Sequence, residues 1–152
     1  MESKKRIKAI CLQLLARRDH SVLELIRKLK VKGFELSSIN EVLAQLLADN
    51  YLNEQRYAES FTRQRILKGY GPKRIEYELN QAGIDDFDMD SVLDETADSW
   101  MDVIAKVYEK KFSQETVITP NEWARRSRFL QQRGFTGSMV SALFKTLNIR
   151  FE

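Results

Sequence analysis

The chain has 152 residues, with 25 Lys and Arg, 22 Asp and Glu, one Cys and one His. This length suits a domain that buries roughly 68–70% of the surface its unfolded chain exposes, so a disulfide or metal staple is not needed. A single Cys excludes an intrachain disulfide, and one Cys with one His excludes a Cys/His zinc site. The composition therefore favours a reducing, cytoplasmic setting, with no metal and no cofactor.

The N-terminal segment is basic, but it does not read as a targeting sequence. Lys8 and Gln13 interrupt its apolar residues, and Arg17 and Arg18 follow directly. This pattern is typical of an amphipathic helix rather than a signal peptide. No stretch approaches the ~20 apolar residues of a membrane span, so we expect no membrane contact.

Apolar residues recur with a period of 3.6 along almost the whole chain, and no run alternates as a strand does. Nine apolar stripes predict nine helices and an all-α fold. The stripes begin at Ile7, Val22, Ile39, Tyr57, Ile75, Met89, Trp100, Trp123 and Met139.

Side chains that cap helices mark the ends of these segments. Asn53 and Thr136 are simple N-cap candidates, and Pro120 suits a first helical position. Capping boxes are predicted for Ser21 with Glu24, Ser38 with Glu41, and Thr119 with Glu122. Helix stops, each with an apolar residue after the glycine, are predicted at Gly33, Gly69, Gly83 and Gly134.

The sequence repeats itself about every 50 residues. A shift of 50 places Leu29 on Leu79 and Gly33 on Gly83, and a further shift of 51 carries Gly83 to Gly134. Periods of this size are typical of stacked helical units that bury their apolar faces against neighbours. We therefore predict a single domain, 1–152, of three tandem three-helix repeats packed into one elongated, curved helical body. The repeats span about 4–50, 51–95 and 96–148.

The net charge of +3 conceals an uneven distribution. Residues 1–50 hold ten basic and six acidic residues (+4), residues 51–94 hold six and nine (−3), and residues 95–152 hold nine and seven (+2). In the second predicted helix, the bases Arg27, Lys28, Lys30 and Lys32 fall off the apolar stripe, with Arg17 and Arg18 nearby. Singly, each suits a solvated helix face, but together they indicate a contact surface for phosphate or carboxylate.

Catalytic and nucleotide-binding motifs are absent from the sequence. No phosphate-binding Gly-rich motif occurs, and the Asp-rich segment 86–90 lacks the Gly and Glu of a calcium loop. His20 has no evident nucleophile, because Cys11 belongs to an apolar stripe. We predict no catalytic residue and no enzyme.

The predicted helix pairs 22–32 with 38–49, and 121–133 with 137–147, resemble helix–turn–helix units. The second helix of the first pair is acidic, and that of the other pair offers Lys145 as its only base. Reading base edges needs Arg, Lys, Asn or Gln on that helix, so sequence-specific recognition is not expected. Weak binding to the nucleic-acid backbone stays open.

Four segments of the chain have a recognisable sequence. They are Leu-Ala-Arg-Arg-Asp-His-Ser-Val-Leu-Glu-Leu-Ile-Arg-Lys-Leu (15–29), Tyr-Leu-Asn-Glu-Gln-Arg-Tyr-Ala (51–58), Lys-Gly-Tyr-Gly-Pro-Lys-Arg-Ile-Glu-Tyr-Glu-Leu (68–79) and Arg-Phe-Leu-Gln-Gln-Arg-Gly-Phe (128–135). These segments resemble the RecX family, regulators of the RecA recombinase. The match runs in order from about Arg6 to Leu147, and its first and third segments are distinctive.

The resemblance implies a bacterial cytoplasmic regulator that lies in the groove of the RecA nucleoprotein filament. There it inhibits filament extension, ATP hydrolysis, strand exchange and coprotease activity, in homologous recombination, DNA repair and the SOS response. The alternative is a nonspecific single- or double-stranded DNA-binding helical module that competes for DNA. Separately, we expect the protein to be a monomer.

The resemblance also indicates which residues make contact with the partner. The family's basic positions are present as Arg18, Lys68, Arg74 and Arg133, although Arg18 and Arg133 serve equally well as helix-end caps. The full predicted contact set is Arg17, Arg18, Arg27, Lys28, Lys30, Lys68, Lys73, Arg74, Arg126 and Arg133.

Overall fold

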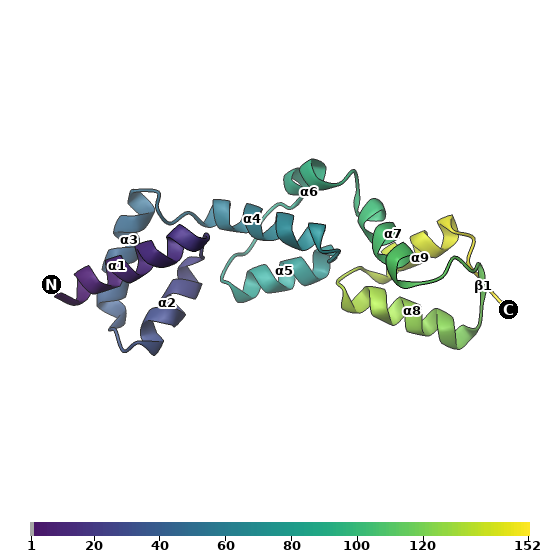
Figure 1. Cartoon of the computed structure of the whole chain (residues 1–152), viewed down its shortest axis with the longest axis horizontal. Coiled ribbons are helices and arrows are strands. Elements are labelled where there is room, and N and C mark those ends of the chain that lie inside the picture. The colour runs from purple at the N-terminus through teal and green to yellow at the C-terminus, as the bar shows by residue number, and fades with distance from the viewer. Residues whose placement is uncertain (1) are drawn as a thin grey trace. The chain divides into compact units, whose positions relative to one another are not determined.

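The protein is described by a computed structural model covering residues 2–152, and these residues are predominantly helical (Figure 1). The described residues form nine helices, which confirms the all-α prediction. The elements are α1 (Glu2–Arg17), α2 (Val22–Val31), α3 (Leu36–Ala48), α4 (Glu54–Leu67), α5 (Pro72–Gln81), α6 (Asp90–Thr96), α7 (Trp100–Lys111), β1 (Val117–Ile118), α8 (Pro120–Gln132), α9 (Gly137–Thr146) and β2 (Arg150–Phe151).

Helix starts follow the predicted caps, except that the box at Ser38 does not form and only the Thr119 half of the box at Thr119 and Glu122 forms, because the Glu122 carboxylate accepts from Arg125 and Arg126. The Ser21 hydroxyl accepts a hydrogen bond from the Glu24 amide, and the Glu24 carboxylate accepts one from the Ser21 amide, each at 3.1 Å. Thr119, Thr136 and Asn53 each accept a hydrogen bond from an amide in the following first turn. These bonds satisfy amides that have no partner within the helix.

The predicted capping box at Ser38 and Glu41 is wrong. Helix α3 already begins at Leu36, and its N-cap residue, Glu35, makes no side-chain cap bond. The preceding turn closes at Phe34, whose amide bonds the Leu29 carbonyl at 3.3 Å. The chain is therefore free to enter the helix directly after that turn, which leaves Ser38 inside the first turn.

The four predicted glycine stops are confirmed, since Gly33, Gly69, Gly83 and Gly134 all have positive φ. The sequence left the connection between α6 and α7 open. In the structure the chain leaves the helix at Ala97, which is extended, and Ser99 then caps α7 by accepting a 3.2 Å bond from Asp102.

A short parallel pairing of β1 with β2 was not predicted. Val117 pairs with Arg150 and Ile118 with Phe151. Two residues per strand are too few to show an alternating pattern, so sequence periodicity does not detect them.

Contacts divide the described residues into two compact units. The first unit comprises the described residues up to Ser60 and the segment Leu79–Phe87. The second comprises Phe61–Glu78 and Asp88–Glu152. The division passes through α4 and α5, whereas the repeat boundaries inferred from the sequence lie between helices.

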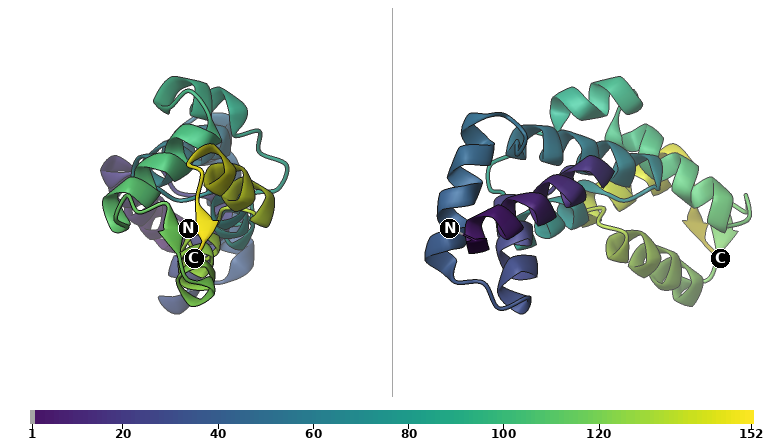
Figure 2. Two further views of the ribbon diagram at one scale, coloured as in Figure 1. Left: turned by 90° about the vertical axis from the view of Figure 1, so that its right-hand side faces the viewer. Right: turned by 60° about the vertical axis from the view of Figure 1, so that its left-hand side comes forward.

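In the first unit, α1 and α2 both pack on α3 (Figures 1 and 2). Its core joins residues of these helices with Leu52, and burial of such side chains contributes about 1.5–3 kcal/mol each as an upper estimate. The core residues are Ile7, Cys11, Leu25, Leu29, Ile39, Val42, Leu43, Leu46 and Leu52.

In the second unit, α7 packs against α8 and α9. Phe144 lies at its centre, with the rings of Tyr108 and Trp123 edge-on at 5.7 and 4.7 Å between centroids. Leu130 and Ile104 are buried beside them. This aromatic core positions α8, whose end carries Arg133.

Candidate interaction surfaces

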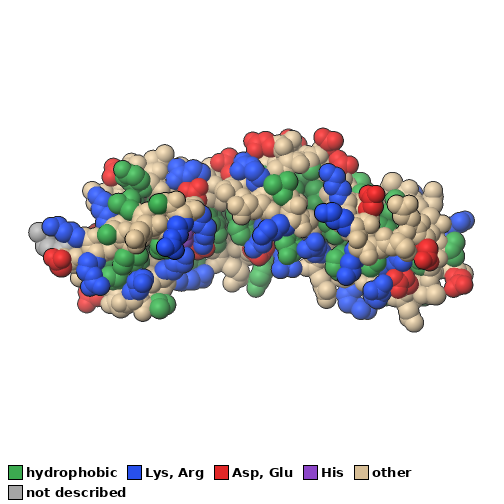
Figure 3. All heavy atoms as spheres, in the orientation of Figure 1, with side chains coloured by type: hydrophobic (Ala, Val, Ile, Leu, Met, Phe, Trp, Pro, Cys, Tyr) green, Lys and Arg blue, Asp and Glu red, His purple; other side chains and the backbone are tan. Residues whose placement is uncertain are grey.

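The first group of predicted contact residues lies at the end of α1 and along α2. We call Arg17, Arg18, Arg27, Lys28 and Lys30 the α1–α2 basic face; all five residues are exposed. Figure 3 shows basic side chains gathered over these two helices. Their charges are not equally available, because some are held by internal bonds.

Arg18 forms a two-pronged ion pair with Glu24. Its two terminal nitrogens each donate to a carboxylate oxygen at 3.2 Å, and this bond raises the pKa of Arg18. Burial tends to raise the pKa of Glu24, but the bonds from Arg18 and from the Ser21 amide lower it overall. Arg18 therefore supports the start of α2, as the helix-end reading allowed, while much of its side chain stays in solvent.

Lys28 is held by the single histidine. His20 is 2% exposed, and its Nδ1 lies 3.1 Å from the Arg18 carbonyl, which can only accept. Nδ1 therefore carries the proton, and Nε2 accepts from the Lys28 ammonium at 2.9 Å. Burial lowers the pKa of His20, which keeps the ring neutral as this arrangement requires. We assign His20 a structural role.

Arg27 is also engaged, since it donates to the Gln81 carbonyl at the end of α5 at 2.9 Å, within the first unit. A cation at a helix C-terminus is favourable because it faces free carbonyls. Arg17 and Lys30 have no side-chain ion pair or hydrogen bond within residues 2–152. These two cations are the least committed members of the face.

A groove of about 450 Å³ runs between α1 and α2 beside this face. Arg17, Lys28 and Lys32 line it together with aliphatic residues, and no carboxylate contributes to the lining. Val31, also in the lining, is 89% exposed. The predicted contact set did not include Val31, and it omitted Lys32 although the sequence already groups Lys32 with the bases of the second helix.

The second group of predicted residues meets at a junction within the second unit. The Gly71 amide donates to the Arg133 carbonyl at 2.8 Å, and the Lys73 amide donates to the Gly134 carbonyl at 3.0 Å. Side chains add to these bonds, because Arg133 donates to the Lys68 carbonyl at 3.3 Å. We call this contact the Gly71–Gly134 junction; it brings together the third and fourth family-like segments.

Tyr70 lies among three guanidinium groups at this junction. The distances from its ring centroid to the guanidinium carbons of Arg74, Arg133 and Arg65 are 4.4, 4.7 and 5.4 Å. Contacts of this kind contribute from about 0.5 to 2 kcal/mol each, according to exposure. Arg65 also pairs with Glu78 at 3.2 Å. Sequence reasoning missed Tyr70 and Arg65, although Tyr70 stands inside the distinctive third segment.

The junction is tight enough to require glycine at two positions. A Cβ on Gly71 would lie 2.5 Å from the Gly134 backbone, and a Cβ on Gly134 would lie 2.5 Å from the Arg74 Cβ. Lys68, Arg74 and Arg133 are thus placed by an internal contact. The Lys73 side chain has no partner among the described residues.

Arg126 does not belong to a surface. It is 4% exposed and donates to Glu122 at 2.8 Å and to the Tyr108 hydroxyl at 2.7 Å. The bonds from Arg125 and Arg126 lower the pKa of Glu122 to about 2. Because its charge is satisfied internally, we leave Arg126 out of the proposed contact surface.

Among residues 2–152, no group of His, Cys, Asp and Glu is arranged to hold a metal ion. Burial raises the pKa of the Cys11 thiol to about 11, which disfavours the reactive thiolate at neutral pH. No helix in this part of the chain is long and apolar enough to cross a membrane.

Structural comparison places the fold among known crystal structures. RecX from Lactobacillus salivarius superposes with a TM-score of 0.76 at 21% identity, covering 98% of this chain and 99% of that one. A second crystal structure, of regulatory protein RecX, gives 0.71 at 19% identity, covering 94% of this chain and 73% of that one. At this identity the match shows a shared fold.

Sequence comparison shows the family. Profiles of the first, second and third three-helix domains of RecX match residues 8–46, 53–93 and 98–144. "Regulatory protein RecX" of Pseudomonas fluorescens (strain SBW25) is 40% identical over 137 residues, which is 90% of this chain and 88% of the relative. The protein of that name in Legionella pneumophila (strain Corby) is 37% identical over 134 residues, 88% and 89% of the two chains. The chain therefore belongs to the RecX family of regulatory proteins.

Proposed function

We propose that this protein binds the RecA nucleoprotein filament and acts mainly as a negative modulator of it. In this role it inhibits filament extension, ATP hydrolysis, strand exchange and coprotease activity. The proposal is supported by the family and by one observation: the α1–α2 basic face presents uncommitted cations next to a groove without carboxylates.

The chemistry of binding follows from Arg17 and Lys30, whose charges have no internal partner among the described residues. Each can pair with a carboxylate of a recombinase subunit or a phosphate of its DNA. A cation that already makes an internal hydrogen bond or ion pair contributes less to the free energy of binding, because it must break that bond to contact a partner. Lys28 and Arg27 therefore contribute less than Arg17 and Lys30.

The test is the ATPase rate of RecA on single-stranded DNA, with the double variant Arg17→Glu, Lys30→Glu set against the wild type. Its matched control is Arg128→Glu, Lys145→Glu, two exposed bases on α8 and α9. We expect the wild type and the control to inhibit equally and the first variant to need about tenfold more protein, since about 1.4 kcal/mol corresponds to that factor. No inhibition by the wild type would refute the proposed function.

The same cations are compatible with a second function, nonspecific DNA binding that displaces the recombinase by competition. That alternative requires binding to naked single strands, with an affinity that falls steeply with salt. The logarithm of the binding constant should fall against the logarithm of the salt concentration with a slope of roughly −0.7 for each phosphate neutralised. Salt-sensitive DNA binding without affinity for RecA protein would favour the alternative.

A further inference from the structure

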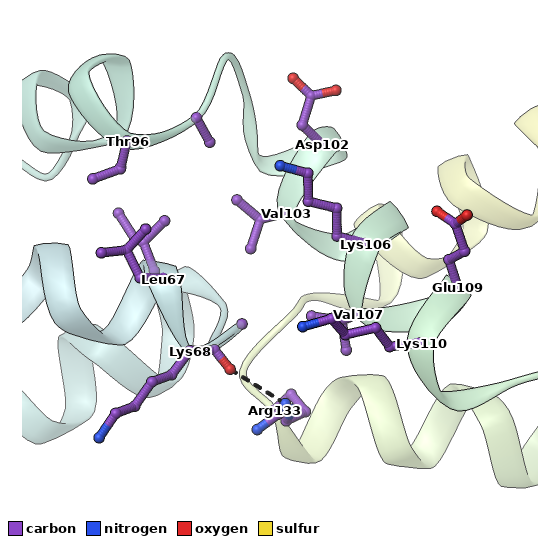
Figure 4. Close-up of a pocket in the computed structure, with 13 residues that line it drawn as sticks. Leu67, Lys68, Thr96, Asp102, Val103, Lys106, Val107, Glu109, Lys110 and Arg133 are labelled. Carbon is purple, nitrogen blue, oxygen red and sulfur yellow. Dashed lines mark hydrogen bonds between the residues drawn. The ribbon is translucent and has the colours of Figure 1, made fainter.

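The second unit contains a pocket that lies outside the α1–α2 basic face and takes only Lys68, Gly69 and Arg133 of its lining from the family-like segments. It has a volume of about 480 Å³ and lies between the end of α4, the α6–α7 connection, α7 and the end of α8 (Figure 4). We call it the α4–α7 pocket. All of its lining residues belong to the second unit.

The walls of the α4–α7 pocket are aliphatic. Val103 and Val107 form one side, and Leu67 faces them from the end of α4 (Figure 4). The Leu67 side chain is 69% exposed. An apolar ligand group seated here would remove this surface from water, which is favourable in proportion to the area covered.

The charges around the pocket are mostly basic. Four of its lining residues carry positive charge, Lys68, Lys106, Lys110 and Arg133, against two carboxylates, Asp102 and Glu109. Figure 4 shows the Lys110 amino group directed toward the pocket, the Lys106 amino group above Val103 at its rim, and both carboxylates directed away from it.

Arg133 adds a fixed donor at the base of the pocket. One terminal nitrogen bonds the Lys68 carbonyl at 3.3 Å, and its Nε is buried without a hydrogen-bond partner in the part of the chain that the structure describes. Lys106 and Lys110 are exposed and have no side-chain partner within residues 2–152. Aliphatic walls with uncommitted cations at the rim suit a ligand that is apolar and anionic at once.

We propose that the α4–α7 pocket binds an acidic segment of a protein partner that carries an aliphatic side chain. The aliphatic group packs against Leu67 and Val107, while carboxylates of the segment pair with Lys106 and Lys110. A single-stranded nucleic acid fits less well, because such strands stack their bases on aromatic side chains and no Phe, Tyr or Trp lines this pocket. This inference rests on the proposed binding to the RecA filament, whose protein component supplies the segment.

The first test is photo-crosslinking to preformed RecA filaments on single-stranded DNA, with p-benzoylphenylalanine in place of Leu67 and, as control, in place of Tyr77. Tyr77 is 64% exposed and does not line the pocket. We expect the Leu67 probe to attach to one RecA peptide that contains Asp or Glu together with Leu, Ile or Val, and the Tyr77 probe not to attach to that peptide. A crosslink to DNA, a peptide without acidic residues, or no crosslink at all would overturn the proposal.

The second test measures filament binding by the variant Lys106→Glu, Lys110→Glu against the control Arg128→Glu, Lys145→Glu. We expect binding about tenfold weaker for the first variant and unchanged binding for the control, because close charge pairs at an interface are worth 1.4 kcal/mol or more. Circular dichroism melting shows whether each variant folds. If the wild type binds and the first variant binds equally well, the pocket proposal fails and the proposed function stands; if the wild type does not bind, both fail.

Discussion

The turns at Gly33 and Gly134 occupy equivalent positions of the first and third repeats and have nearly the same local structure. Their φ angles are +92° and +106°, and in each the following Phe amide bonds a carbonyl five residues back, at 3.3 and 3.2 Å. Their surroundings differ. An added Cβ on Gly33 meets nothing within 4 Å, whereas one on Gly134 meets the Arg74 backbone at 2.7 Å and the Gly71 carbonyl at 2.9 Å.

This comparison separates two roles of one motif. At Gly33 the turn ends a helix and leaves the neighbouring bases on a surface that is open to partners. At Gly134 the same turn becomes one side of the Gly71–Gly134 junction, and the neighbouring base, Arg133, bonds the Lys68 carbonyl. The repeated sequence thus encodes the turn in each repeat, and tertiary contacts decide whether the turn also joins two segments.

The largest expected effect follows directly from this difference. We expect Gly134→Ala to lower the free energy of unfolding by about 3 kcal/mol, because left-handed strain of about 1–2 kcal/mol adds to overpacking of similar size. Gly33→Ala, with the strain alone, should cost about 1 kcal/mol. Urea unfolding followed by tryptophan fluorescence reports on the second unit through Trp100 and Trp123, and circular dichroism reports on the whole chain.

Gly71→Ala is the matched control for overpacking, because Gly71 has no positive φ but would place its Cβ 2.5 Å from the Gly134 backbone. We expect it to be destabilising without the left-handed strain. Equal losses for Gly33→Ala and Gly134→Ala would show that the junction does not form in solution.

A second prediction concerns Arg126, the base that the second unit keeps inside. We expect Arg126→Met to lower the free energy of unfolding by about 2 kcal/mol, since Met fills most of the volume but removes the donor to the buried Tyr108 hydroxyl and leaves Glu122 with Arg125 alone. Urea unfolding followed by tryptophan fluorescence measures this loss. Arg125→Met is the control, because Arg125 is exposed and also pairs with Glu122; similar losses in the two variants would contradict the internal role of Arg126.

The third prediction is a pH dependence in the first unit. Because burial lowers the pKa of His20, its neutral form stabilises the fold, and this contribution is complete above the ordinary value near 6.5. As the pH falls below about 6.5, the unfolded chain binds the proton first and stability is lost down to the folded pKa. We expect a smaller effect than for Arg126, because protonation removes the bond from Lys28 and leaves the bond from Nδ1 to the Arg18 carbonyl intact.

The groups facing His20 that enter this titration are Arg18, Lys28 and Glu24, of which the two cations lower its pKa and the carboxylate raises it. His20 is the only histidine, so its ring protons give one unambiguous NMR titration. A midpoint at or above 6.5 would contradict the buried, neutral assignment, and His20→Gln should remove the dependence of stability on pH between 5 and 7.

How far the sequence predicts this molecule depends on whether a feature is local. Helix periodicity, the Ser21 box and the left-handed glycines are local, and the structure confirms them. The start of α3 was predicted wrongly because the capping pattern at Ser38 suggests a later start. The preceding turn already ends at Phe34, so the helix begins at Leu36. The α4–α7 pocket could not be predicted, because it joins Leu67 to residues about 40 and 65 positions away, and one sequence does not show such contacts.

The predicted contact residues follow the same rule. Their charge and their place off the apolar stripe are visible in the sequence, but whether a cation is committed is decided by a distant partner. Arg27 meets the Gln81 carbonyl, 54 positions away, and Arg133 meets the Lys68 carbonyl, 65 positions away. Arg126 looked like a surface base because its burial and its bond to Tyr108, 18 positions away, depend on how α7 packs against α8.

The smallest expected effect concerns Arg18, an exposed base of the first repeat. We expect Arg18→Ala to lower the free energy of unfolding by about 0.5 kcal/mol, because it removes the ion pair with Glu24 and exposed ion pairs contribute about 0.2–1 kcal/mol. The side chain of Arg18 is 51% exposed, so salt screens the pair, and the loss should shrink between 0.05 and 0.5 M NaCl by roughly half. Urea unfolding of the two proteins at both salt concentrations measures this difference. A loss as large as that for Gly134→Ala, or one insensitive to salt, would mean that Arg18 supports the fold internally, as Arg133 does. The contrast between the exposed turn at Gly33 and the packed turn at Gly134 would then no longer hold.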